Sequence, residues 1–215
     1  MRVYVETNFL LELVFEQEQL GDCELVLAWA ERGSLDLRAP AYSLFEASEA
    51  VRLRVKKRQE FQRDFRDHLR QIKRQGPFAN DPSADGVESL LRRSTQSLEQ
   101  RLNACLGRLK GAAQSLVRLD ADDVAEARLL ADECKLKSPD ALVLASVLGD
   151  LQRNPSTAAF VTRDNKGFDT QPVRSRLASR QCSLFGSFHD LANHLRHEKG
   201  LAAPNETTPA KPEPS

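Results

Sequence analysis

The stretch Val3-Tyr4-Val5-Glu6-Thr7-Asn8-Phe9-Leu10-Leu11 joins a short strand-forming run to the start of a helical pattern. Val3 to Val5 are β-branched or aromatic, which predicts a buried strand, and the helical pattern continues to about Phe15. Thr7 or Asn8 is expected to cap that helix. Glu6 therefore stands at the carboxyl end of the first strand, where open parallel sheets bind their ligands. A carboxylate in the first turn of a helix is also favourable local electrostatics, so Glu6 alone does not decide a function.

Strands and helices alternate along the rest of the chain. Further strands are expected at 35–37, 115–119, 158–162 and 182–185. Helices are expected at 23–32, from 44 to about 75, from 87 to about 111, from Asp120 or Asp122 to Cys134, from Ser138 through Leu148, and from 188 to about 197. This alternation predicts a three-layer α/β fold with a mostly parallel sheet of about five strands.

Two of the expected helices are long and lie next to each other in the sequence. Their apolar residues keep helical spacing, and residues 78–86 between them are rich in turn formers, which predicts a loop. The two segments therefore indicate an antiparallel helical hairpin at about 50–112. The main domain is expected to span 1–197, and the proline-containing tail at 198–215 is expected to be disordered.

The composition indicates a soluble protein with one substantial core. The chain has 215 residues, of which 40% are apolar and 29% are charged. The four cysteines are scattered without paired spacing, so neither a zinc site nor a disulfide framework is indicated, and a cytoplasmic location fits best. No apolar run approaches the ~20 residues that a membrane span needs, so no membrane partner is expected.

The formal net charge of zero hides an uneven distribution. Residues 50–110 contain fifteen Lys and Arg against seven Asp and Glu, whereas the rest of the chain contains 16 against 24. One segment is therefore basic and the remainder is acidic. This distribution predicts an element that binds anions, mounted on a body that gathers carboxylates.

Four carboxylates can meet at one edge of the expected sheet. Glu6 and Asp164 directly follow strands, while Glu46 and Asp140 lie in first turns of helices. Each has an ordinary structural explanation; Ser43 and Glu46, for example, have the spacing of a capping box. Clustered carboxylates repel one another, however, and need a cation to be tolerated.

The order of these motifs resembles that of the PIN-domain nucleases, the fold of the toxins in many bacterial toxin-antitoxin pairs. Glu6-Thr7-Asn8 is similar to the opening Asp-x-Asn of that family, with Glu in place of the usual Asp. The family's later acids match Glu46, Asp140 in Lys137-Ser138-Pro139-Asp140, and Thr162-Arg163-Asp164 with the nearby Phe168-Asp169. The resemblance covers the first 50 residues and about 115–197, which leaves the hairpin as an insertion.

The resemblance implies a ribonuclease that uses Mg²⁺ or Mn²⁺ to hydrolyse RNA phosphodiester bonds. Glu6, Glu46, Asp140 and Asp164 would hold the metal, and Asp169 would assist catalysis at a second site. Asn8 and Thr162 would give polar support. An antitoxin-like protein partner is a further implication of the family.

Two alternatives remain open at this stage. The extra methylene of Glu6 disturbs a site in which Mg²⁺ requires ligands at ~2.0 to 2.1 Å, so the chain is alternatively a degenerate PIN scaffold that binds nucleic acid or a protein without cleavage. The hairpin is expected to contact RNA phosphates through Lys56, Lys57, Arg63 and Arg70. Its competing use is a homodimer interface built from Phe61, Phe65 and Leu69.

Overall fold

The computed structural model describes residues 1–79, 81, 83–112 and 115–201. Within this part of the chain, five parallel strands form one sheet in the order β3-β2-β1-β4-β5. The strands are β1 (Arg2–Val5), β2 (Asp36–Pro40), β3 (Ser115–Val117), β4 (Ala158–Val161) and β5 (Cys182–Phe185). The predicted α/β class is therefore confirmed, and the sheet is parallel throughout.

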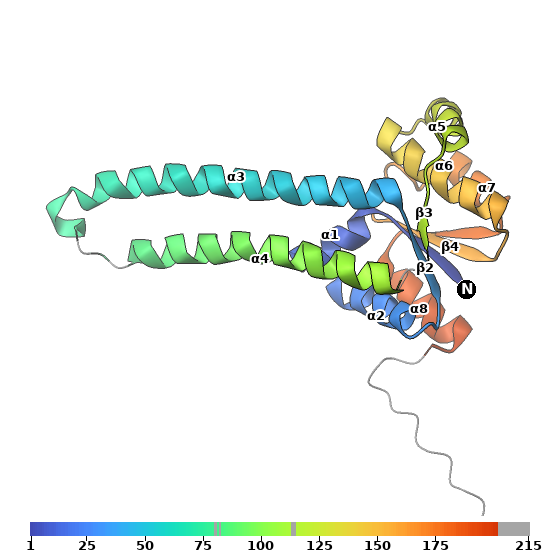
Figure 1. The fold of residues 1–215 in the computed structure, drawn as a ribbon, viewed down its shortest axis with the longest axis horizontal. Coiled ribbons are helices and arrows are strands. Elements are labelled where there is room, and N and C mark those ends of the chain that lie inside the picture. The colour runs from blue at the N-terminus through green and yellow to red at the C-terminus, as the bar shows by residue number, and fades with distance from the viewer. Residues whose placement is uncertain (80, 82, 113–114, 202–215) are drawn as a thin grey trace, which may run out of the picture.

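Helices connect the strands and flank the sheet (Figure 1). They are α1 (Thr7–Phe15), α2 (Leu20–Glu31), α3 (Ala41–Lys73), α4 (Ser83–Ala112), α5 (Ala121–Cys134), α6 (Ser138–Arg153), α7 (Gln171–Ala178) and α8 (Phe188–Lys199), with a short 3₁₀ turn η1 (Gly76–Phe78). Helix α7 was not predicted, and α4 begins inside the segment that was predicted to be a loop. Of the predicted disordered tail, residues 198 and 199 belong to α8, and 202–215 lie outside the described residues.

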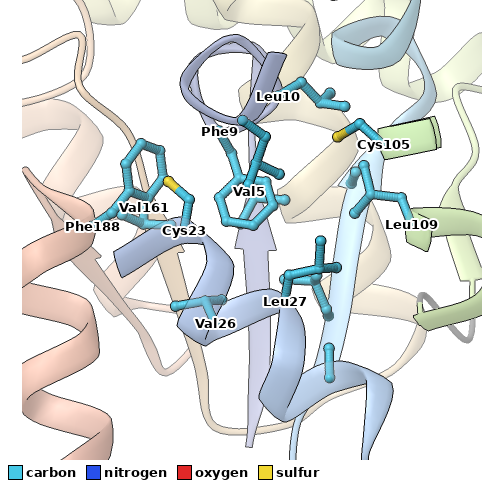
Figure 2. Close-up of a cluster of buried hydrophobic side chains, with 14 of the residues drawn as sticks. Val5, Phe9, Leu10, Cys23, Val26, Leu27, Cys105, Leu109, Val161 and Phe188 are labelled. Atoms are coloured by element: carbon cyan, nitrogen blue, oxygen red, sulfur yellow. The ribbon is translucent and has the colours of Figure 1, made fainter. Parts of the chain in front are cut away.

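Two apolar cores lie on opposite faces of the sheet, because successive side chains of a strand point to opposite faces. Val3 and Val5 pack with α1, α2 and α8, whereas Tyr4 and Phe160 pack with α5, α6 and α7. Figure 2 shows that Cys105 and Leu109 of α4 enter the first of these cores, beside Leu10 and Leu27. The base of α4 is therefore part of the core, and the arrangement is compatible with the expected three layers.

Helices α3 and α4 lie side by side and run in opposite directions, and their far ends project well beyond the sheet (Figure 1). The 33 residues of α3 correspond to roughly 50 Å. Polar contacts join the two helices along their length: Gln62 Nε2 donates to Thr95 Oγ1 at 3.0 Å, and Arg66 Nη2 donates to Glu88 Oε1 at 2.8 Å. None of the helices in the described part of the chain has the combined length and apolarity that a bilayer crossing requires.

The direction in which strands are added to the sheet reverses between β1 and β4. From β1 the chain builds β2 and β3 on one side, and then returns to build β4 and β5 on the other. Val5 of β1 pairs in register with Val161 of β4, so the next residues, Glu6 and Thr162, leave the sheet next to each other. Open α/β sheets bind ligands where the strand order reverses in this way.

Candidate functional site

Glu6 caps α1 with its own side chain. Its Oε2 accepts a hydrogen bond from the backbone amide of Asn8 at 2.9 Å, so the prediction that Thr7 or Asn8 caps this helix is wrong. The side chain is only 5% exposed, and Oε1 is buried without a hydrogen-bond partner among the described residues. Burial raises the pKa of Glu6 to about 7, while Asn8 and, less strongly, the nearby Thr162 favour the charged form.

This pKa makes stability depend on pH in a way that Glu6→Gln should remove. The unfolded carboxyl ionises near 4.5 and the folded one near 7, so the folded state keeps a proton that the unfolded state has lost. The contribution of Glu6 to stability should therefore fall as pH rises from about 4.5 to 7 in metal-free buffer, by on the order of 3 kcal/mol. Urea unfolding at pH 4 and pH 8 should show Glu6→Gln gaining this amount relative to wild type at the higher pH. An equal difference at both pH values would contradict the raised pKa.

Asp164 is held in a tight turn directly after β4. The Asp164 amide donates to the buried Thr162 hydroxyl at 2.9 Å, and the Gly167 amide donates to Asp164 Oδ1 at 3.0 Å. Phe168 anchors the turn because its ring packs edge-on against Phe160 in the core, at a centroid distance of 5.2 Å. The backbone and the core together therefore fix the direction of this carboxylate.

Gly167 brings Asp164 and Asp140 to a common point. A Cβ atom at Gly167 would lie 2.8 Å from Asp164 Oδ2 and 3.5 Å from Asp140 Oδ2, so the two carboxylates face the same small space. Asp140 lies in the first turn of α6. Burial, then Asp164 and then Glu46 raise the pKa of Asp140, and Lys137 opposes the rise. Asp164 and Glu46 are therefore both within electrostatic reach of Asp140.

The Glu46 side chain is held by a hydrogen bond from α1 and not by a capping box. The Thr7 hydroxyl donates to Glu46 Oε2, across 39 residues of sequence. The predicted Ser43 to Glu46 capping box is wrong because α3 begins at Ala41, with Pro40 as its N-cap, directly after β2. The Ser43 hydroxyl is instead buried without a partner in the described structure. Helix α6 begins at Ser138, as predicted, and its N-cap is Lys137.

Asp169 points to a different partner from the other predicted acids. Its Oδ1 accepts a hydrogen bond from Arg174 Nε at 2.5 Å, and Arg174 lowers the pKa of Asp169. Asn8 and Thr162, the predicted polar supports, both lie beside Glu6. The prediction omitted Tyr42. Burial and then the charges of Glu46 and Asp140 raise the pKa of Tyr42, so its side chain lies next to these acids. Its position four residues before Glu46 on one helix was the available signal.

The donor set suits a hard divalent cation that keeps much of its water. Among the residues that the structure describes, no group of three or more His, Cys, Asp or Glu side chains is spaced to hold one metal ion. Mg²⁺ commonly needs only one or two protein carboxylates, with water and substrate phosphate completing its shell. Asp140 and Asp164 fit that requirement, because their oxygens face one point and repel each other without a cation.

Comparisons with protein-family models, with curated proteins and with solved structures found no match to this chain. The features that indicate a function are therefore the carboxylates near the carboxyl ends of β1 and β4 and the charges of the hairpin. These features belong to the chain itself and are open to direct mutational test.

Proposed function

We propose that the protein is a divalent-metal-dependent ribonuclease similar to the PIN-domain nucleases. The observation that carries this proposal is the approach of Asp140 and Asp164 to one point beside Gly167, with Glu46 close enough to affect the pKa of Asp140. The position supports the same conclusion, because Glu6 follows β1 and Asp164 follows β4, where the strand order reverses. Like charges gathered at a ligand-binding edge favour a cation there.

In this proposal Asp140 and Asp164 hold Mg²⁺ or Mn²⁺, and Glu46 and Glu6 contribute directly or through water. When bound, the cation would neutralise negative charge on the phosphodiester during hydrolysis. Thr162 fixes the Asp164 backbone, and Thr7 fixes the Glu46 carboxylate. We leave Asp169 outside the metal-binding set because its carboxylate is paired with Arg174.

The second candidate function is a scaffold that binds nucleic acid or a protein partner, such as an antitoxin, without cleavage. Glu6 favours this alternative, because its Oε2 caps α1 through Asn8 while its Oε1 has no hydrogen-bond partner among the described residues. The absence of a three-ligand group among the described residues points the same way. Titration with Mn²⁺ separates the two functions, since a catalytic centre requires the cation and a scaffold does not.

The hairpin supplies positive charge near the proposed centre. Lys56, Arg63 and Arg70 recur every seven residues on α3, which places them on one face of the helix. The side chains of Lys56 and Arg70 are 64% and 68% exposed, and their contacts with Glu60 and Asp67 are surface ion pairs that contribute little. Lys57 and Arg63 are also exposed. These residues are therefore free to exchange their neighbours for RNA phosphates.

Neutralising Lys56, Lys57, Arg63 and Arg70 to Gln should weaken RNA binding and flatten its dependence on salt. Each phosphate contact on a single strand contributes a slope of about −0.7 in log affinity against log salt, so loss of four contacts should reduce the slope by up to about 3. Fluorescence anisotropy in EDTA measures this, and Mn²⁺ binding should stay unchanged.

The hairpin would instead be a subunit interface if RNA binding proved independent of salt and a dimer dissociated on replacing Phe61, Phe65 and Leu69. Phe61 is 55% exposed and stacks on Phe65 at a centroid distance of 6.1 Å, so these rings are available for such a contact. Sedimentation of the triple Ala variant would decide the question.

A further inference from the structure

A separate pocket lies where the end of α1 meets α3 and α4. It encloses about 330 Å³, and three of its lining residues are Arg54 and Arg58 of α3 and Arg101 of α4. Ser94 and Ser97 of α4 line the same pocket. The pocket therefore combines guanidinium groups and hydroxyl groups from two helices that the hairpin holds together.

Two of these arginines have no acidic partner within the described part of the chain. Arg58 Nη1 donates to Ser94 Oγ at 2.6 Å and to the Ser94 carbonyl at 3.0 Å, both of which are neutral. Arg54 lies over the ring of Phe15, 5.2 Å from its centroid. Of the three, Arg101 alone forms an ion pair with a described residue, Glu16, at 2.8 Å. The described residues that line the pocket therefore include three arginines and no acid.

Two arginines elsewhere in the described structure are each paired with two acids. Arg108 binds both Glu24 and Glu31, and Arg163 binds both Glu12 and Glu18. Like charges that face one cavity repel each other, just as the carboxylates do at the candidate metal site. An anion in the cavity would relieve that repulsion and would satisfy the free guanidinium donors.

We propose that this pocket binds a phosphoryl group, carried either by a free nucleotide or by a nucleic-acid strand. Guanidinium forks match phosphate and carboxylate oxygens alike, but the oxygens of a phosphate are arranged tetrahedrally, three of them terminal in a mononucleotide and two non-bridging in a strand, and this suits donors that converge from several residues. The volume is within the range of small-molecule sites, so a phosphate and part of its nucleoside fit.

The pocket does not overlap the candidate metal site. Glu6 caps the start of α1 and Phe15 ends it, so the two sites are separated by roughly the 13 Å length of that helix. Eight residues of α3 likewise separate Glu46 from Arg54, or roughly 12 Å. The proposal goes beyond the ribonuclease function, and phosphoryl binding in the pocket requires no metal.

The test is binding in EDTA, in which cleavage and metal binding are both absent. Inorganic phosphate and a 5′-mononucleotide are titrated by calorimetry, and a labelled single-stranded oligoribonucleotide by anisotropy. The double variant Arg54→Gln/Arg58→Gln should bind at least one probe about tenfold or more weakly, because charge-assisted hydrogen bonds are lost. The matched control is Arg92→Gln/Arg93→Gln, which removes the same charge from exposed residues of α4 outside the pocket.

A further variant separates loss of the pocket from loss of the fold. Ser97→Asp places a carboxylate among the arginines without removing the bond between Arg58 and Ser94, so it should abolish binding while the melting temperature is kept. Weakened mononucleotide binding would identify a free nucleotide as the ligand. An effect confined to the oligoribonucleotide, with the salt slope reduced by about 0.7, would identify one phosphate of a strand.

Absence of binding by every probe, or equal weakening in the pocket variant and the control, would overturn the proposal. Failure of the ribonuclease function would appear separately, as absence of cleavage and of Mn²⁺ binding in wild type.

Discussion

Asp140→Asn and Asp164→Asn should each lower the rate of RNA cleavage by about 100-fold or more, because each removes a charged ligand from the proposed metal centre. Asn has nearly the same shape as Asp, so the fold should be kept. Stability without metal should be equal to or above that of wild type. Burial and then repulsion by Asp164 raise the pKa of Asp140, and each variant relieves that repulsion. Cleavage of a labelled RNA in Mn²⁺ and calorimetric Mn²⁺ titration measure the two effects.

The matched control for these variants is Asp169→Asn. It removes a carboxylate from the same segment that follows β4, but one that Arg174 holds away from the cluster. Its activity should remain near that of wild type. The catalytic proposal fails if Asp140→Asn and Asp164→Asn both cleave at the wild-type rate in preparations free of contaminating nuclease. Loss of RNA cleavage without loss of Mn²⁺ binding would show that other residues bind the metal.

Gly149→Ala should lower the free energy of unfolding by about 2–3 kcal/mol, through overpacking between α5 and α6. A Cβ atom there would lie 2.1 Å from Asp123 Oδ1. Asp123 is buried and cannot move freely, because its other oxygen accepts from the Asp120 amide and closes the capping box of α5. Moving it would also disturb the ion pair with Arg153.

This effect has the opposite sign to the usual one. In a helix interior, replacing Gly with Ala normally stabilises by about 0.5–1 kcal/mol. Gly107 of α4 is the control, because a Cβ atom there would meet nothing within 4 Å. Urea denaturation should therefore show Gly107→Ala stabilised and Gly149→Ala destabilised. Stabilisation of both variants would mean that Asp123 can move away at little cost.

The fold could be predicted from the sequence where a local pattern was strong. The apolar run of β1 followed directly by a helix, and the long stripes of α3 and α4, have periods that only one kind of element satisfies. Helix α7 was missed because its eight residues, with Pro172 near their start, carry only two buried apolar side chains. The start of α3 was predicted too late, because Ser43 and Glu46 have the spacing of a capping box. The helix instead begins at Ala41, directly after β2, and needs no such cap.

The acids of the candidate site could be predicted from the sequence, but the contacts that these acids make could not. Strand ends locate Glu6 and Asp164 from the sequence alone, and a first helical turn locates Asp140. Glu46 was also predicted to lie in a first turn, but it lies in the second turn of α3 because that helix begins at Ala41. The bond from Thr7 to Glu46, and the space at Gly167 that Asp140 and Asp164 share, depend on how distant segments pack. The capping role of Glu6 was missed because a residue that ends a strand can equally begin the next helix.

The entry of α4 into the core has a consequence for the order in which the chain folds during synthesis. Cys105 and Leu109 fill space against residues of α1 and α2 (Figure 2), so a nascent chain that ends before Cys105 cannot close this core. By then β1, β2 and the whole of α3 have been synthesised, but the apolar surfaces that α4 will cover are still exposed. The N-terminal half therefore depends on later residues for its completion, and its exposure before then is the stage at which aggregation or chaperone capture competes with folding.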